Sequence, residues 1–201
     1  MSGTDVSTGQ NGRRRPARER LLAAAARRFY ADGVAATGID TITADAGVAK
    51  MSLYNNFSSK AELVRAYLDA RHEEWLGLYR TRLEQARGPR AGVLAVFDAY
   101  ADHAASGYEH GFRGCGLLNA AAELPAADEG RAVVRAHKEE VERLIAGHLE
   151  ELLAGRPDEA HATAEHLSFL LEGAMARAGL EGDGVRLQRA RSLAADLLER
   201  L

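Results

Sequence analysis

The segment from Ile39 to Lys60 constrains the fold more than any other part of this chain. Its apolar residues recur at helical spacing in two short runs, which predicts two helices of about two turns each. The positions predicted to face inward are Ile39, Ile42, Ala46, Leu53, Tyr54 and Phe57. Gly47 lies between the two runs and can adopt the positive φ that a tight turn needs. Two short helices joined in this way form a helix-turn-helix.

The second helix of this pair presents polar side chains on the surface opposite its apolar side. These outward residues are Lys50, Met51, Ser52, Asn55 and Asn56. Lysine can bond to guanine, and asparagine can form two hydrogen bonds with adenine, in the major groove of DNA. The pattern therefore predicts a helix that reads double-stranded DNA. The alternative is an ordinary solvated helix surface.

Several short motifs at fixed spacing resemble the DNA-binding domain of the tetracycline-repressor (TetR) family. They are Phe29-Tyr30-Ala31-Asp32-Gly33, Ala46-Gly47-Val48, Ser52-Leu53-Tyr54, Phe57 and Lys60. The match covers roughly residues 18–64. Over the remaining chain the resemblance rests on length, helical pattern and one local motif around Cys115.

The resemblance implies base contacts from Lys50, Asn55 and Asn56, beside Met51 on the same surface. It implies phosphate contacts from Ser52, Tyr54 and Lys60, although the Tyr54 ring could equally be part of the core. Gly38 and Asp40 stand where related proteins often have Thr or Ser and a basic residue. We therefore expect Thr37 or Thr41 to supply the phosphate contact of the first helix.

The charge of the chain is unevenly distributed, although the net charge is only −3 over 201 residues. Residues 1–62 contain nine Lys or Arg and six Asp or Glu, which leaves 17 basic and 23 acidic residues elsewhere. A basic end on an acidic body suits a protein that meets DNA phosphate with one part only. No apolar run is long enough to cross a membrane, and none follows the N-terminal arginines. We expect a cytoplasmic protein without signal peptide, and its single cysteine fits a reducing compartment.

The periodicity predicts an all-α fold of nine helices, because no segment alternates like a strand. Residues 1–15 are expected to be a disordered tail whose three final arginines either enter a minor groove or aid solubility. Residues 16–62 are expected to form the helix-turn-helix domain, and residues 63–201 a helical effector-binding and dimerisation domain. Ser59 and Glu62 form a capping box that starts a helix reaching to about residue 87. Later helices are predicted at 89–106, 114–124, 128–154, 157–178 and 185–201.

The helices between residues 63 and 154 carry large aromatic and polar side chains on apolar faces. As a group they are candidates for lining a ligand cavity, and the alternative for each is core packing. The candidates are Trp75, Tyr79, Phe97, Tyr100, His103, Tyr108, Phe112, Cys115, Asn119 and His137. Buried polar groups among them need partners, which a small-molecule effector could supply.

The last two predicted helices carry wide stripes of Leu and Ala. In proteins resembling this one, these helices form a four-helix bundle with a twin subunit, and the pattern fits a homodimer. The candidate interface residues are Leu167, Leu170, Leu171, Ala174, Leu193 and Leu197. Arg113-Gly114-Cys115-Gly116-Leu117-Leu118-Asn119 with Glu123 resembles a motif in TetR-like regulators, some of which sense electrophiles through the cysteine. The alternative for Cys115 is a small buried hydrophobe.

The combined reading is a ligand-responsive transcriptional regulator. We expect a repressor that binds a pseudo-palindromic operator as a homodimer and is released by a small-molecule effector. Two alternatives stay open: a constitutive DNA-binding protein without effector, and a helical small-molecule-binding or enzymatic protein. The sequence has no phosphate-binding loop, nucleophile elbow or zinc-type cluster of Cys and His. We therefore expect no enzyme activity, no metal and no cofactor.

Overall fold

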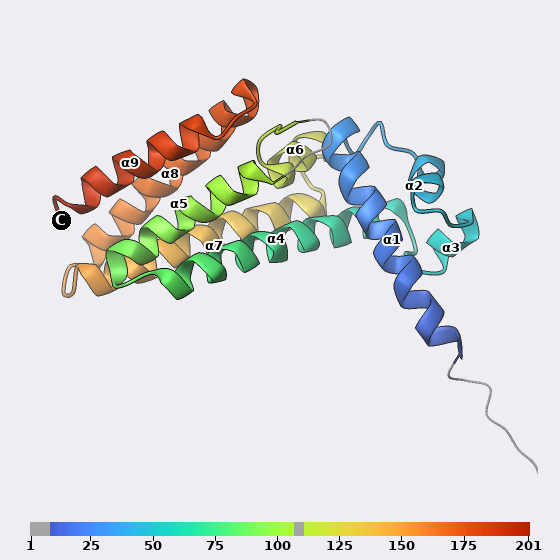
Figure 1. The fold of residues 1–201 in the computed structure, drawn as a ribbon, viewed down its shortest axis with the longest axis horizontal. Coiled ribbons are helices and arrows are strands. Elements are labelled where there is room, and N and C mark those ends of the chain that lie inside the picture. Colours follow the sequence, from blue (N-terminus) through green and yellow to red (C-terminus); the bar gives the residue numbers. More distant parts are fainter. Residues whose placement is uncertain (1–8, 107–110) are drawn as a thin grey trace, which may run out of the picture.

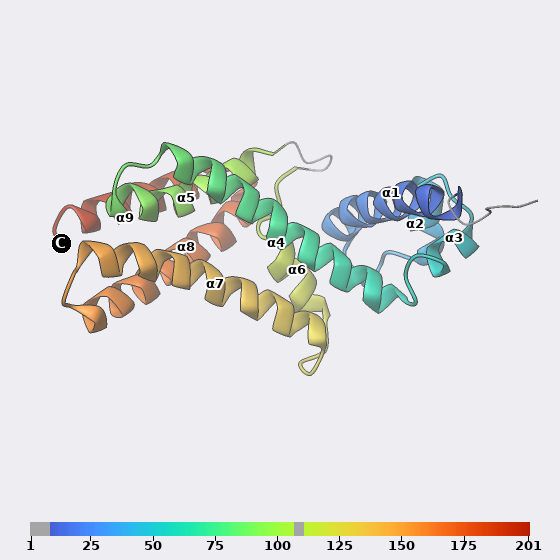
Figure 2. The ribbon, with the colours of Figure 1, turned by 90° about the horizontal axis from the view of Figure 1, so that it is seen from below.

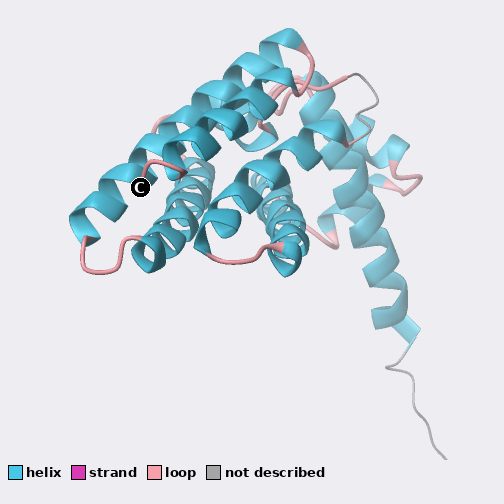
Figure 3. Cartoon of the chain, turned by 60° about the vertical axis from the view of Figure 1, so that its left-hand side comes forward, coloured by secondary structure: helices cyan, strands magenta, loops and turns pink. Residues whose placement is uncertain are grey.

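The computed structural model describes residues 9–106 and 111–201. Within these ranges the chain forms helices and contains no strand, which confirms the predicted all-α class (Figure 3). The helices are α1 (Gly9–Asp32), α2 (Ile39–Asp45), α3 (Lys50–Tyr54), α4 (Lys60–Gln85), α5 (Pro89–Ala105), α6 (Gly116–Glu123), α7 (Glu129–Leu152), α8 (Pro157–Glu181) and α9 (Val185–Leu198). None of the helices in the described ranges is long and apolar enough to span a bilayer.

The first three helices form an N-terminal unit, called the head below (Figure 1). Phe29 of α1, Ile42 of α2 and Leu53 of α3 are buried together in its core. The Arg28 guanidinium on α1 bonds to the Asp45 carboxylate on α2, with Nε 2.5 Å from Oδ2. The head is therefore a small packed unit whose third helix lies at the surface.

The start of α1 differs from the predicted boundary. A disordered tail was expected for residues 1–15, but α1 begins at Gly9 and includes residues 9–15. Residues 1–8 of that tail lie outside the described residues. Once the packed part of α1 has formed, adding residues to its N-terminal end carries no further nucleation cost, so the helix extends beyond the segment that packing alone would require.

Helix α4 leads from the head into the remaining five helices, called the body (Figure 2). The Ser59 hydroxyl accepts a hydrogen bond from Glu62 N over 3.1 Å, as the predicted capping box requires. The Glu62 carboxylate, however, accepts from Ser58 N over 2.6 Å, one residue earlier than expected. Helix α4 then packs against α5 and α7, so its direction is set by both the head and the body.

The body consists of α5, α6, α7, α8 and α9, with α8 and α9 on the side away from α2 and α3 (Figure 1). Helices α5 and α7 are in contact with α4, and α8 packs between α7 and α9. Its centre is closely filled by residues such as Phe97, Tyr100, Ile145 and Leu149, all at most 2% exposed. Helix α6 is short and lies between the body and the head, where it contacts both α1 and α7.

Candidate DNA interface and effector site

Helix α3 presents a mixed polar and apolar surface to solvent. Met51 is 68% exposed and Tyr54 is 49% exposed, while Lys50 and Asn55 are also exposed. Tyr54 was expected either to contact phosphate or to place its ring in the core, and the structure places the ring outside the core. Leu53 and Phe57, at most 1% exposed, are instead the residues that pack inward from this segment.

Ser52 and Asn56 lie at the edge of this surface and are half-buried. The Asn56 side-chain amide donates to the Ser52 carbonyl over 2.7 Å, which closes the last turn of the helix. One of the two hydrogens of its side-chain amide is therefore already engaged, whereas Asn55 has a more exposed side chain. Of the two asparagines, Asn55 is the better placed for a contact with a base.

Lys50, the first residue of α3, forms an ion pair with Asp40 of α2, with Nζ 2.8 Å from Oδ1. The hydrogen bond to Asp40 raises the pKa of Lys50. Both side chains are more than half exposed, so this pair is worth little for stability and can be opened by a competing partner. Asp40, the departure from the family pattern, therefore orients the lysine that was predicted to read a base.

The two threonines predicted as alternatives for a phosphate contact differ in position. Thr37 is 2% exposed, and its hydroxyl donates to the Gly33 carbonyl over 2.6 Å. Its side chain is thus part of the α1–α2 loop and is removed from the proposed contacts. Thr41 is exposed on α2, and Lys60 is half-buried at the start of α4.

Five of the residues predicted to bind an effector meet around one small cavity in the body. Trp75, Tyr100, His103, Cys115 and His137 line it together with Arg71, Gly116 and Leu117. We call this space the effector cavity. Its volume is about 10 Å³, which is room for at most one water molecule.

The other predicted ligand residues have different roles in the described structure. Phe97 is fully buried in the core, and Phe112 is 8% exposed but does not line the effector cavity. The Tyr79 hydroxyl lies 2.8 Å from Nε2 of His148. The Asn119 amide donates to the Arg113 carbonyl over 2.9 Å, which orders the loop before α6. Tyr108 lies outside the described residues.

A half-buried lysine beside the cavity was not predicted from the sequence. Lys138 Nζ lies 2.8 Å from the Glu172 carboxylate, 3.3 Å from the Tyr100 hydroxyl and 3.6 Å from Cys115 Sγ. Burial by itself lowers the pKa of Lys138, but Tyr100, Cys115 and Glu172 raise it by more, so the lysine stays charged. Nothing in the spacing of Lys138 and Glu172 marks them as partners, because they lie on different helices.

The cavity wall contains polar groups held in an apolar environment. His137 Nδ1 lies 2.8 Å from His72 Nδ1, and His137 Nε2 lies 3.4 Å from the Tyr100 hydroxyl. Trp75 Nε1 has no hydrogen-bond partner within the described residues. An indole N–H that is buried without an acceptor is costly, so this donor favours a guest that carries an acceptor atom.

Acid is expected to destabilise the protein between pH 6.5 and about 4. Burial, followed by the charges of Arg71 and Lys138, lowers the pKa of His103 to about 4. Burial and the charge of Lys138 lower the pKa of His137 to about 3. Both rings stay neutral in the folded protein while the unfolded chain binds protons below pH 6.5, so stability falls as the pH falls.

For each of these two histidines the free energy of unfolding should fall by up to about 1.4 kcal/mol per pH unit in that range. Urea denaturation followed at several pH values measures this slope. His137→Gln should make the slope shallower, whereas His166→Gln, at an exposed position on α8, should leave it unchanged. Equal slopes for wild type and His137→Gln would contradict the assignment.

Two sets of hydrogen bonds fasten the body to the head. The Glu123 carboxylate, at the end of α6, accepts from Val34 N over 3.1 Å and from Ala35 N over 2.7 Å. The Arg113 guanidinium donates to the Tyr30 carbonyl over 3.0 Å, at the end of α1. A Cβ atom at Gly33 would lie 2.7 Å from Glu123, so the glycine permits this close approach. We call these contacts the α6 clamp.

The predicted dimer residues divide between the core and the surface. Leu167 and Leu171 are at most 1% exposed and pack inside the chain's own core, so they are not available to a partner. Both residues belong to the buried core cluster, and the helix that carries them, α8, packs against α7 and α9. Leu170, Ala174 and Leu197 are half-buried, and Leu193 is 38% exposed.

An apolar groove of about 300 Å³ lies along the outer side of α8 and α9. We call it the α8/α9 groove. Its walls include Phe169, Leu170, Gly173, Ala174 and Leu193. Phe169 is 66% exposed and was not predicted, although its position next to Leu170 on a helix surface rich in apolar residues was a usable signal. An exposed aromatic ring beside small residues is typical of an interface.

The fold and the exposed α3 surface define a helix-turn-helix transcriptional regulator, and comparisons with known proteins identify the family. Residues 21–67 match the family described as bacterial regulatory proteins, tetR family. A crystal structure of a TetR-family transcriptional regulator from Streptomyces coelicolor is similar, with a TM-score of 0.81 and 33% identity. That similarity covers 92% of this chain and 95% of the other chain. The chain therefore belongs to the TetR family.

Two curated relatives match over shorter stretches. The HTH-type transcriptional activator FasR of Mycolicibacterium smegmatis is 40% identical over 107 residues, which are 49% of this chain and 48% of FasR. The HTH-type transcriptional regulator TtgR of Pseudomonas putida is 46% identical over 56 residues, 28% of this chain and 27% of TtgR. The chain thus aligns with half or less of each curated relative. Both relatives are named as regulators of transcription, and the TetR family, to which the chain belongs, consists of transcriptional regulators and not of enzymes, as expected.

Proposed function

We propose that this protein is a homodimeric repressor that binds a pseudo-palindromic operator and is released by a small-molecule effector. The observation that supports this proposal most strongly is the position of α6. Its first residues line the effector cavity, and its last residue, Glu123, bonds to the α1–α2 loop of the head. A ligand that displaces α6 would therefore act directly on the part that meets DNA. Because its target is DNA, the protein is proposed to act in the cytoplasm.

The effector cavity is too small for an organic molecule in the present conformation, at about 10 Å³. An effector would bind a state in which α6 and α7 have separated, and it would gain the unused Trp75 N–H as a donor. Binding of this kind shifts the equilibrium only if the opened state is poor at binding DNA. The α6 clamp supplies the link, because opening the cavity moves the anchor of the head.

The proposed base contacts come from the exposed surface of α3, with Lys50 and Asn55 as the principal readers and Met51 in apolar contact. Asn56 is proposed as a secondary base contact, since one of the two hydrogens of its side-chain amide already bonds to the Ser52 carbonyl. Phosphate contacts are proposed for Ser52, Tyr54, Lys60 and Thr41. The α8/α9 groove is proposed to pack against the same groove of a second copy, which would place two heads on one operator.

Titration of fluorescently labelled DNA from the region upstream of the protein's own gene tests this function. Anisotropy should show saturable binding of this DNA. When small organic molecules from a library are added one at a time, the effector should weaken the binding. A reporter gene behind the same DNA should be silent in the presence of the protein and active when the effector is added. Tight binding that no ligand weakens would favour the constitutive alternative, and activation of the reporter would contradict the repressor role.

Cys115 is expected to act in packing and not in sensing. Its side chain is 8% exposed at the start of α6 and fills part of the cavity wall, as most free cysteines do. We expect Cys115→Ser to lose about 1 kcal/mol of stability and to keep its response to a reversible effector. Anisotropy with operator DNA measures the response. A quinone that releases wild type but not Cys115→Ser would contradict this role and establish electrophile sensing.

A further inference from the structure

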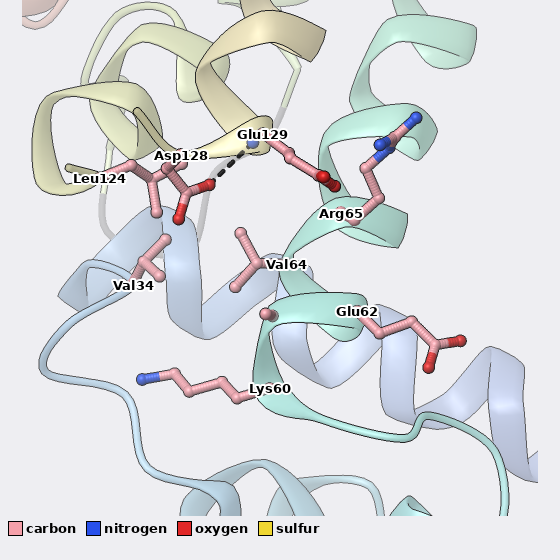
Figure 4. Close-up of a pocket in the computed structure, with 10 residues that line it drawn as sticks. Val34, Lys60, Glu62, Val64, Arg65, Leu124, Asp128 and Glu129 are labelled. Carbon is pink, nitrogen blue, oxygen red and sulfur yellow. Dashed lines mark hydrogen bonds between the residues drawn. The ribbon is translucent and has the colours of Figure 1, made fainter. Parts of the chain in front are cut away.

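A second and much larger cavity lies at the junction of the head and the body, outside the effector cavity. Its volume is about 670 Å³, within the range of known ligand sites. It is bounded by the α1–α2 loop, the first turns of α4 and the connection from α6 to α7 (Figure 4). We call it the junction cavity. Nothing in the proposed effector mechanism makes use of it.

The walls of the junction cavity are apolar on facing sides. Val34 comes from the α1–α2 loop, Val64 from α4 and Leu124 from the end of α6 (Figure 4). These three side chains belong to three separate elements, so an apolar molecule between them would contact both the head and the body. Burying such a molecule would gain free energy in proportion to the apolar area removed from water.

The charged groups around the cavity differ in whether they already have partners. Glu62 bonds to Ser58, and Arg65 pairs with Asp69. The Asp128 carboxylate accepts from Gly130 N over 2.8 Å, shown as the dashed line in Figure 4. Glu129 is exposed to solvent.

Arg65 pairs with Asp69, so Lys60 is the one basic side chain in this wall that remains without a partner among the described residues. It is half-buried, and it has no ion pair or hydrogen-bond partner in the described part of the chain. A partly buried ammonium is stabilised by an anion that comes within bonding distance. The cavity therefore offers a positive group at one end of an apolar space.

We propose that the junction cavity binds a small organic anion with an apolar chain, of the class of the medium-chain carboxylic acids. The carboxylate pairs with Lys60, and the chain packs between Val34, Val64 and Leu124. Lys60 is also a proposed phosphate contact, so the ligand should affect DNA binding as well. This effect on DNA binding rests on the proposed function. A bound carboxylate occupies the ammonium and weakens the binding of every DNA sequence alike.

The test is calorimetric titration of the full-length protein, without DNA, using octanoate as the probe. Octanoate should bind with saturation and shift the methyl NMR signals of Val34, Val64 and Leu124. Acetate has the charge without the chain, and octylamine has the chain with the opposite charge. Neither should bind at the same concentrations.

Three variants locate the site. Lys60→Gln should weaken octanoate binding by about tenfold or more, since a charge-assisted hydrogen bond is lost. Arg65→Gln removes the same formal charge from the rim of the cavity and should leave the affinity unchanged. Ala61→Phe fills the cavity from an exposed position on α4 and should block binding while preserving the melting temperature.

Several results would overturn the proposal. Octanoate binding that survives both Lys60→Gln and Ala61→Phe would place the ligand elsewhere, for example in the effector cavity. Preferential binding of octylamine would mean that the acidic residues determine the ligand. Absence of octanoate binding would also contradict it. Since no DNA is present, each of these results leaves the proposed regulation of the operator untouched.

Discussion

Phe169→Asp is expected to abolish tight operator binding, although the residue lies on α8 in the body and α3 belongs to the head (Figure 1). A carboxylate in the α8/α9 groove would lose its hydration in the proposed dimer interface, so the two copies should separate. The remaining monomer engages one half-site only. Loss of the second, effectively intramolecular contact should lower operator affinity by about 10²- to 10⁴-fold.

Light scattering and anisotropy measure these two effects on one sample. Leu193→Asp, in the same groove on α9, should behave like Phe169→Asp. Ser192→Asp is the matched control, because its neighbouring position on α9 is exposed but does not line the groove. A monomeric Phe169→Asp protein that still bound its operator as tightly as wild type would remove the dimer from the account.

Lys50→Ala is expected to cost about 1–3 kcal/mol at the cognate operator and to relax the preference at one base pair in each half-site. The reason is the position of the lysine at the exposed start of α3, where Asp40 orients its ammonium. Lys60→Ala should instead weaken binding to all sequences to a similar degree. For Lys60→Ala, the slope of log affinity against log salt concentration should become shallower by about one, because about one counterion fewer is released on binding.

Competition titrations with single-base operator variants measure the specificity of each protein. Both variants lose one positive charge, so each serves as the control for the other. If Lys50→Ala discriminated among the variants as wild type does, the reading surface would have to lie elsewhere on the head. Asp40→Asn should free Lys50 and strengthen binding to unrelated DNA as well.

The helices were predictable because local and periodic signals agree at most positions. Gly47 adopts φ +61° between α2 and α3, and Ser59 caps α4, as their residue types indicated. Pro89 and Pro157 begin α5 and α8. Each of these residues affects only the backbone a few positions away in the sequence. Sequence patterns predict such local effects well.

The predictions that failed concern which neighbour a side chain meets. Leu167 and Leu171 lie in the same stripe as Leu170, but the inner side of the stripe packs on the chain itself and only the outer side remains for a partner. Thr37 was predicted as one of two possible phosphate contacts, but its hydroxyl donates to the Gly33 carbonyl over 2.6 Å. Periodicity identifies an apolar face of a helix without stating which element covers it.

The candidate effector site was partly predictable for the same reason. Aromatic and polar residues on apolar faces indicated an internal cluster, and Trp75, Tyr100 and His137 do meet. The pairing of Lys138 with Glu172 depends on how α7 packs against α8. The small size of the effector cavity and the large junction cavity depend on the packing of several helices at once.

Binding to an operator whose half-site spacing is changed tests the central claim most directly, namely that a dimer carries two α3 readers in fixed relation. Inserting about five base pairs at the operator centre turns one half-site to the opposite side of the duplex, half a helical turn away. Anisotropy should then show affinity reduced to that of an isolated half-site. Unchanged affinity for the lengthened operator would contradict the claim.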